Sequence, residues 1–187
     1  MLSAPAPQTE ILLRELAPKL AGVAGLARYA PCWTVMAELL HLPEGLRPVI
    51  VEEGILGWVS LEASRPGATP SGAVTLQANA DYTERFLESP PEQVIKDVTT
   101  AYQQAQNIQT LKWGYKRAHR WRYAKVIKPA PPDSPFMENF SANILALAGD
   151  WHPVSATPDK LASGGRAEEA LLSGYRAALE TLSRLAN

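Results

Sequence analysis

The stretch that decides the fold is NILALAGD, residues 143–150, which is followed after a loop by SGGRAEEALLSG, residues 163–174. The first is a short apolar run that stops at a glycine and an aspartate, as a buried strand does where it leaves a sheet. The second opens an amphipathic helix, which we expect over 166–185. Two glycines before a helix let the backbone approach a ligand closely, and the helix N-terminus offers free N–H groups. The sequence predicts a strand–loop–helix unit that can face an anionic or carbonyl-rich ligand, unless the glycines merely cap the helix.

Upstream of this unit, the sequence predicts a sheet accompanied by helices. Runs rich in apolar and β-branched residues indicate strands at 32–36, 49–51, 57–62, 73–78, 108–113 and 118–126. Apolar spacing indicates helices at 8–20 (with Pro18 ending or kinking the helix), 21–27, 81–87 and 91–106. Ser89 with Glu92 resembles a capping box for the last of these. The fold class is therefore α+β, with a mainly antiparallel sheet before Pro131 and the strand–loop–helix unit after it.

Composition limits the classes of function. The 187 residues carry a net charge of -1 and are 46% hydrophobic, so a core is available and bulk charge does not favour nucleic acid or an anionic membrane. No targeting segment and no run of about 18 apolar residues is visible, so we expect a soluble, cytoplasmic protein. Cys32 is alone and is expected to be a small buried hydrophobe. His41 and His152 are isolated, and no spacing of ligands predicts a metal.

The strand expected at 118–126 carries a concentration of aromatic and basic residues. Alternation places His119, Trp121 and Tyr123 on one face, and Arg120 and Arg122 on the other. On a functional interpretation, one of these two faces lines a substrate cavity. The alternative is an ordinary strand that has one packed face and one solvated face. Seven basic residues form a local positive stripe: Lys112, Lys116, Arg117, Arg120, Arg122, Lys125 and Lys128. This stripe either binds a phosphate-bearing substrate or is a solvated strand face.

Five segments, in order and spanning nearly the whole chain, carry a more specific signal. They are APAPQTEILL (4–13), YAPCWTVM (29–36), WVSLEASRPG with LQANADYTERFLE (58–67 and 76–88), AHRWRYAK (118–125) and the tail described above. Together they resemble the renalase-like family of FAD-dependent amine oxidases, in which a strand ending in AGD is followed by a GGR-type loop and a helix. The match covers only the C-terminal two-thirds of such an enzyme.

The resemblance implies an FAD-binding domain and a substrate domain with a mainly antiparallel sheet. On that template, residues 1–8 end an FAD-domain strand, 9–138 form the substrate-binding domain, and 139–187 are the C-terminal portion of the FAD-binding domain. The implied cofactor-binding residues are Asp150, Trp151, Gly164, Gly165 and Arg166. The candidates for the substrate cavity are Trp33, His119, Trp121 and Tyr123. Because the cofactor carries the chemistry, no catalytic residue is assigned.

The chain departs from the family pattern at two points. Glu169 stands where the family has a small residue, and no GxGxxG fingerprint follows a strand. We therefore expect the C-terminal part of an oxidoreductase that takes a hydride from an amine or dihydropyridine-like substrate, or else a non-catalytic binding or interaction module. The strand at 144–148 is expected inside a parallel sheet. It would be covered by a separate chain carrying the GxGxxG half, by a second copy, or by a rearranged tail.

Overall fold

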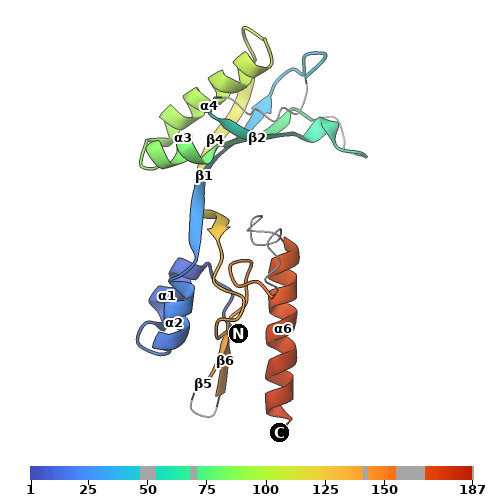
Figure 1. The fold of residues 1–187 in the computed structure, drawn as a ribbon. Coiled ribbons are helices and arrows are strands. Elements are labelled where there is room, and N and C mark those ends of the chain that lie inside the picture. Colours follow the sequence, from blue (N-terminus) through green and yellow to red (C-terminus); the bar gives the residue numbers. More distant parts are fainter. Residues whose placement is uncertain (47–53, 68–70, 141–142, 155–166, 187) are drawn as a thin grey trace. The chain divides into compact units, whose positions relative to one another are not determined.

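The computed structural model describes residues 1–46, 54–67, 71–140, 143–154 and 167–186. The chain divides into two compact units (Figure 1). Unit 1 comprises Met1–Ala30 and Lys125–Asn187, and unit 2 comprises Pro31–Ala124. These boundaries differ from those expected at residues 8 and 138. The assignment of segments to an FAD-binding and a substrate-binding domain stays a prediction.

Unit 2 is built on a four-stranded antiparallel sheet with the strand order β2-β3-β1-β4. The strands are β1 (Arg28–Leu39), β2 (Leu56–Leu61), β3 (Ala73–Ala78) and β4 (Trp113–Lys128). In the centre of the sheet, Val35 pairs with Leu76, which pairs in turn with Val59. All three side chains are buried on the same face, so the period-two pattern of the sequence sets the core side of the sheet.

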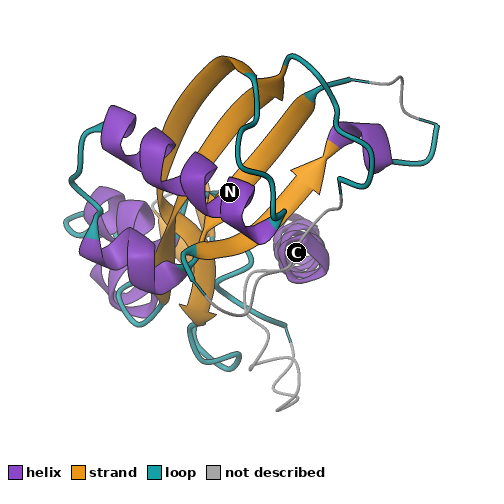
Figure 2. Ribbon diagram, turned by 90° about the horizontal axis from the view of Figure 1, so that it is seen from above, coloured by secondary structure: helices purple, strands orange, loops and turns teal. Residues whose placement is uncertain are grey.

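Helices cover that core face. They are α3 (Ala80–Arg85) and α4 (Pro91–Ala105), and a short 3-10 helix, η1 (Glu62–Ser64), follows β2. Helix α4 packs against β2 and β3 and buries Val94, Val98 and Tyr102 at its contact with the sheet. Figure 2 shows helices lying across the strands. The opposite face of the sheet carries no helix among the residues described here.

Unit 1 holds α1 (Ala6–Leu13), α2 (Pro18–Ala24), β5 (Met137–Phe140), β6 (Asn143–Ala146) and α6 (Ala167–Leu185). Strands β5 and β6 form an antiparallel pair. On its other side the β6 segment pairs in parallel with Leu2, whose N–H donates to the Ala146 carbonyl over 2.8 Å and whose carbonyl accepts from Ala148 over 3.0 Å. Leu147 and Trp151 lie in the core of this unit.

The structure confirms an α+β fold, and several elements lie where the sequence predicts them. Strand β3 covers 73–78, α4 begins at Pro91, and α6 ends at Leu185. The helix expected over 8–20 is two helices, because Pro18 has no N–H to continue α1 and instead takes the first position of α2. The strand expected at 49–51 lies outside the described residues.

Three expectations from the sequence are wrong. Residues 108–111 are not a strand: they follow Asn107, which has a φ of 55°, and the Leu111 N–H donates to the Gln103 side chain rather than to a neighbouring strand. Ser89 does not cap α4, because Pro90 is its N-cap and no side chain bonds there. The run at 144–148 lies between an antiparallel partner and a single parallel bridge rather than inside a parallel sheet.

Candidate functional site

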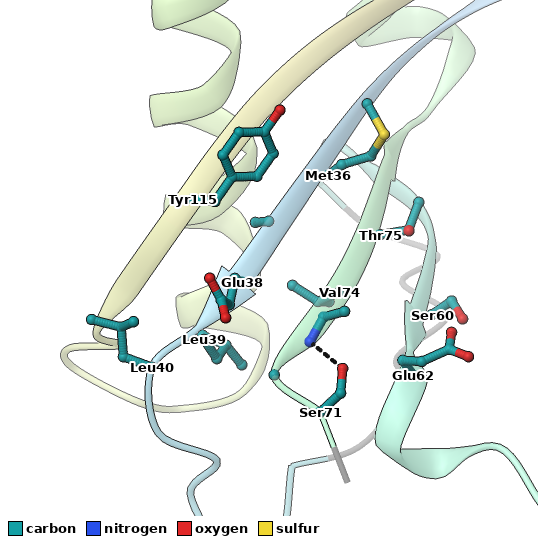
Figure 3. Close-up of a pocket in the computed structure, with 13 residues that line it drawn as sticks. Met36, Glu38, Leu39, Leu40, Ser60, Glu62, Ser71, Val74, Thr75 and Tyr115 are labelled. Atoms are coloured by element: carbon teal, nitrogen blue, oxygen red, sulfur yellow. Dashed lines mark hydrogen bonds between the residues drawn. The ribbon is translucent and has the colours of Figure 1, made fainter. Parts of the chain in front are cut away.

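The helix-free face of the unit 2 sheet is hollowed into a cavity of about 830 Å³. Figure 3 shows that its side chains come from all four strands and the segments that flank them. Among them are the apolar Met36, the hydroxyls of Ser60, Thr75 and Tyr115, and the carboxylate of Glu38. The cavity therefore combines aromatic, aliphatic and polar side chains, as small-molecule binding sites commonly do.

An aromatic row continues along β4 from this cavity. Tyr115, His119, Trp121 and Tyr123 are separated by even intervals, so alternation directs them to one face of the strand. The rings of His119 and Trp121 meet edge to face with centroids 4.2 Å apart. Trp121 is 52% exposed and Tyr123 38% exposed, so large aromatic surfaces remain open to a ligand. Three of the four predicted cavity residues thus lie together, and Tyr115 adds a fourth ring that the sequence analysis did not include.

The opposite face of β4 is anchored by Glu88, which follows α3. Arg122 binds its two carboxylate oxygens over 2.7 and 3.1 Å, while Arg120 binds one of them over 2.5 Å and also donates to the Leu87 carbonyl over 2.7 Å. Hydrogen bonds from Arg122 and the charges of both arginines lower the pKa of Glu88. Two members of the predicted basic stripe are therefore engaged in holding β4 to the α3–α4 connection.

Trp33 lies apart from the other cavity candidates. It is buried in the core of unit 2, and its indole N–H donates to the Phe86 carbonyl over 3.0 Å. The guanidinium of Arg120 lies 5.5 Å from the centre of its ring. Trp33 therefore faces the helices and supports Arg120, rather than lying on the exposed aromatic row.

In unit 1, Gly149 and Asp150 end the β6 segment. Gly149 has a φ of 156°, and a Cβ atom there would lie only 2.6 Å from Nε1 of Trp151, so the close packing of the indole requires glycine. Asp150 is half-buried; burial raises its pKa, which the backbone N–H groups of Asp150 and Trp151 oppose. Its carboxylate also raises the pKa of Tyr29, for which burial is the larger cause. A desolvated acceptor thus lies at the carboxyl end of the strand.

Trp151 is a core residue in this structure. Its side chain is 1% exposed, and its N–H donates to the Ala4 carbonyl over 3.2 Å. Gly164, Gly165 and Arg166, the remaining predicted cofactor ligands, lie outside the described residues. The cofactor candidates belong to unit 1 and the cavity candidates to unit 2.

A buried polar cluster in unit 1 links α6 to the turn after β6, and the sequence analysis missed it. The Ser173 hydroxyl accepts from the Gly149 N–H over 3.2 Å, and the Arg176 guanidinium lies 2.8 Å from Nδ1 of His152 and 4.1 Å from the centre of the Phe136 ring. Burial and the charge of Arg176 lower the pKa of His152 to about 4. The signal in the sequence is a polar row at Glu169, Ser173 and Arg176, which one face of a helix brings together.

Several atoms of this cluster are buried and have no hydrogen-bond partner within the described residues. They are Nε2 of His152, Oε2 of Glu169 and Nε of Arg176. Glu169 is 5% exposed, so the residue that departs from the family pattern is enclosed by the chain. A buried polar atom without a partner costs free energy, and such atoms often mark a place where a ligand or a further chain completes the structure.

Two of the five residues predicted to bind FAD lie within the described part of the chain. Of the two predicted ligands that the structure describes, Asp150 offers a partly exposed carboxylate, whereas Trp151 is engaged in the core. Within the described part of the chain, no group of three or more His, Cys, Asp or Glu is placed to hold a metal ion. No helix in the same residues is long and apolar enough to cross a membrane.

No family model matches the sequence, and no curated protein matches it. The resemblance to renalase-like oxidases therefore rests on the five sequence segments.

Proposed function

We propose that this chain is the C-terminal part of an FAD-dependent oxidoreductase of the renalase-like type. The substrate class is an amine or a dihydropyridine-like compound. FAD, when bound, supplies the chemistry by accepting a hydride, so the protein has to bind and orient the two molecules. The residues of this chain contribute a ligand-facing strand end in unit 1 and an aromatic sheet face in unit 2.

The arrangement around β6 carries the proposal. The segment pairs in parallel with Leu2, ends at Gly149 and Asp150, and is followed by α6, which packs back against it. The single parallel bridge and the helix that follows the segment support the proposal, because parallel α/β layers bind nucleotides outside the carboxyl ends of their strands. Asp150 lies at that end. Its raised pKa fits a carboxylate kept from water that gains from hydrogen bonds donated by ligand hydroxyls.

The sheet face of unit 2 supports the substrate half of the proposal. A planar ring stacks favourably on exposed aromatic side chains, and β4 offers those of Trp121 and Tyr123 beside His119. Arg120 and Arg122 hold the opposite face of the same strand to Glu88. The row is therefore presented from an anchored strand rather than from a free loop, which reduces the ordering cost of binding a ligand.

A second candidate function is a non-catalytic binding or interaction module. Two observations favour it: the Trp151 indole is committed to the core, and the Glu169 carboxylate is buried where the family has a small residue. A buried carboxylate close to the start of α6 disfavours an anionic ligand there. On this alternative the chain keeps the ancestral fold and has lost the flavin.

Retention of FAD distinguishes the two functions. The chain is prepared alone and together with any polypeptide that co-purifies with it from its natural source, incubated with FAD, desalted, and assayed for flavin released on denaturation. The oxidoreductase retains FAD, and Asp150→Ala reduces the retained amount at least about tenfold, the loss of one charge-assisted hydrogen bond. Asp133→Ala, an exposed aspartate in the same unit, leaves it unchanged. If no variant, including the unaltered chain, retains FAD in any combination, the non-catalytic module is correct.

A further inference from the structure

The cavity on the helix-free face of unit 2 has an acidic lining. Within the described part of the chain, the charged side chains that line it are Glu38 and Glu62, and no lysine, arginine or histidine joins them. Glu62 forms an ion pair with Arg65 over 3.3 Å. Glu38 is exposed and has no hydrogen-bond or ion-pair partner among the described residues. A cavity lined by charges of one sign concentrates ligands of the opposite sign, so the unpaired carboxylate favours a cation.

The carboxylate of Glu38 lies beside two positions that have little or no side chain. Glu38 pairs with Ala73 across the ladder of β1 and β3. On the β4 side, Oε2 of Glu38 lies 3.1 Å from the place that a Cβ atom on Gly114 would take. A larger side chain at position 114 would therefore crowd the carboxylate. The alanine and the glycine together leave the carboxylate accessible to the charged group of a ligand.

An aromatic ring and a thioether lie close to this carboxylate in the cavity. Tyr115 follows Gly114 on β4 and is 59% exposed, and Met36 lies two residues before Glu38 on the same face of β1 and is 39% exposed. Figure 3 shows the three side chains on neighbouring strands that line the cavity. The face of an aromatic ring attracts an ammonium group, and a polarisable thioether packs well against its alkyl substituents.

Hydroxyl groups extend the row that begins at Met36. Thr75 pairs with Met36 on one side and with Ser60 on the other, and all three residues line the cavity. These hydroxyl groups can bond to a hydroxyl or carbonyl group of a ligand whose cationic end lies at Glu38. The cavity therefore offers a partner for each part of a small, singly charged, polar cation.

We infer that this cavity binds a small organic cation, in which an alkyl-substituted ammonium group contacts Glu38, Tyr115 and Met36. The site goes beyond the proposed function, because it requires neither FAD nor hydride transfer. A phosphate-bearing or carboxylate ligand is disfavoured by the two glutamates of the lining. A purely apolar ligand would take the Glu38 carboxylate out of water without giving it a partner.

Methyl NMR of the full chain, labelled at its methionines, tests the site. Choline is the probe, because its permanent charge and its hydroxyl match the carboxylate and the hydroxyl row. Its nitrogen has no lone pair to assist the loss of a hydride, so its binding is measured apart from any oxidase activity. We expect the Met36 methyl signal, identified with Met36→Leu, to shift saturably with choline. Dimethylbutanol, the uncharged carbon isostere of choline, should bind at least about fivefold more weakly, because it lacks the charge.

Substitutions separate the contribution of the charge from that of the ring. Glu38→Gln is expected to weaken choline binding at least about fivefold and to leave the binding of dimethylbutanol unchanged. Glu84→Gln removes an exposed carboxylate of α3 and is the matched control, with choline binding unchanged. Tyr115→Leu should weaken choline binding about two- to fivefold, whereas Tyr115→Phe, which keeps the ring, should not. The methionine methyl spectrum verifies that each variant remains folded.

Three results would overturn the inference. The first is a Met36 methyl signal that does not shift saturably when choline is added to the unaltered chain. The second is equal affinity of the unaltered chain for choline and for dimethylbutanol. The third is an unchanged affinity for choline in folded Glu38→Gln.

Discussion

Arg176 donates a hydrogen bond from its guanidinium to Nδ1 of His152, 2.8 Å away. Because a guanidinium has no acceptor, Nδ1 must accept, and the proton of the neutral imidazole lies on Nε2. His152 is completely buried, and Arg176 reaches it from α6 across the turn that follows β6. The pair therefore joins the last helix to the strand segment, and it does so only while the imidazole is neutral.

Unit 1 is expected to lose stability on acidification because of this pair. The pKa of His152 falls from 6.5 to about 4 on folding, so the folded state binds fewer protons than the unfolded state between these values. The contribution to stability is present above about pH 6.5 and is lost as the pH falls to about 4. It is on the order of 3 kcal/mol at most. Chemical denaturation followed across this pH range measures it.

His152→Gln is the control for the acid effect. The amide oxygen of glutamine can still accept from Arg176, but the side chain does not titrate. We expect a variant that is less stable near neutral pH because the imidazole packing is lost, with a shallower loss of unfolding free energy between pH 6.5 and 4. An equal pH dependence in both proteins would mean that other groups cause the acid sensitivity.

Gly149→Ala is expected to destabilise unit 1 by about 1–3 kcal/mol, the range for overpacking a core. The added methyl group would lie 2.6 Å from Nε1 and 2.8 Å from Cδ1 of the Trp151 indole, which is buried and bonded to the Ala4 carbonyl. The comparison is Gly22→Ala within α2, where no atom lies within 4 Å of the new methyl group. That change should stabilise by up to about 1 kcal/mol. Thermal unfolding of the two variants should shift in opposite directions; a shift in the same direction refutes the steric account.

Asp150→Asn is expected to raise stability near neutral pH. Burial raises the pKa of Asp150 above 3.8, so the folded state holds its proton more tightly than the unfolded state. The stability from this group is present below pH 3.8 and is lost as the pH rises through the folded pKa. Removal of the charge should therefore stabilise at pH 7 and have little effect at pH 3, as urea titrations at the two pH values would measure. A variant that is less stable at pH 7 would mean that the carboxylate is satisfied within the fold.

Arg120 is expected to matter more than its neighbour Arg122 for the stability of unit 2. Arg120 bonds to the Leu87 carbonyl and to Glu88 and lies over the Trp33 ring, whereas Arg122 bonds to Glu88 alone through an exposed pair. Arg120→Ala should cost roughly 1–3 kcal/mol, and Arg122→Ala should cost less, with an effect that disappears in high salt. Denaturant titrations at low and high salt compare them. The anchoring role is wrong if the two variants are equally destabilised.

The elements that follow from local patterns were predictable. The alternation of AVTLQA places β3, Pro91 marks the start of α4, and the amphipathic spacing after residue 166 places α6. The alternation along β4 also separated His119 and Trp121 from Arg120 and Arg122. Each of these features depends on residues that lie within one helical turn or one strand of each other. Over that range, the periodicity of the sequence determines which side chains share a face.

The elements that depend on distant residues were not predictable. Nothing in the sequence near Glu88 indicates that it holds Arg120 and Arg122, and the strand end expected at residues 1–8 came without a partner residue such as Leu147. Likewise, Trp33 is buried where it bonds to Thr83 and Phe86, fifty or more residues away in the sequence, which local composition does not determine. Sequence reasoning therefore predicted the aromatic row but not the anchor behind it, and it predicted the strand end but not the cluster at His152.

The central claim is that this chain works as part of a flavin oxidoreductase. The most direct measurement is the visible absorption spectrum of the chain isolated from its natural source under conditions that preserve complexes. It is recorded before and after an amine or a dihydropyridine is added without oxygen. The account predicts the two bands of a bound oxidised flavin and their bleaching by one of these substrates. A colourless preparation that takes up no added FAD would contradict it.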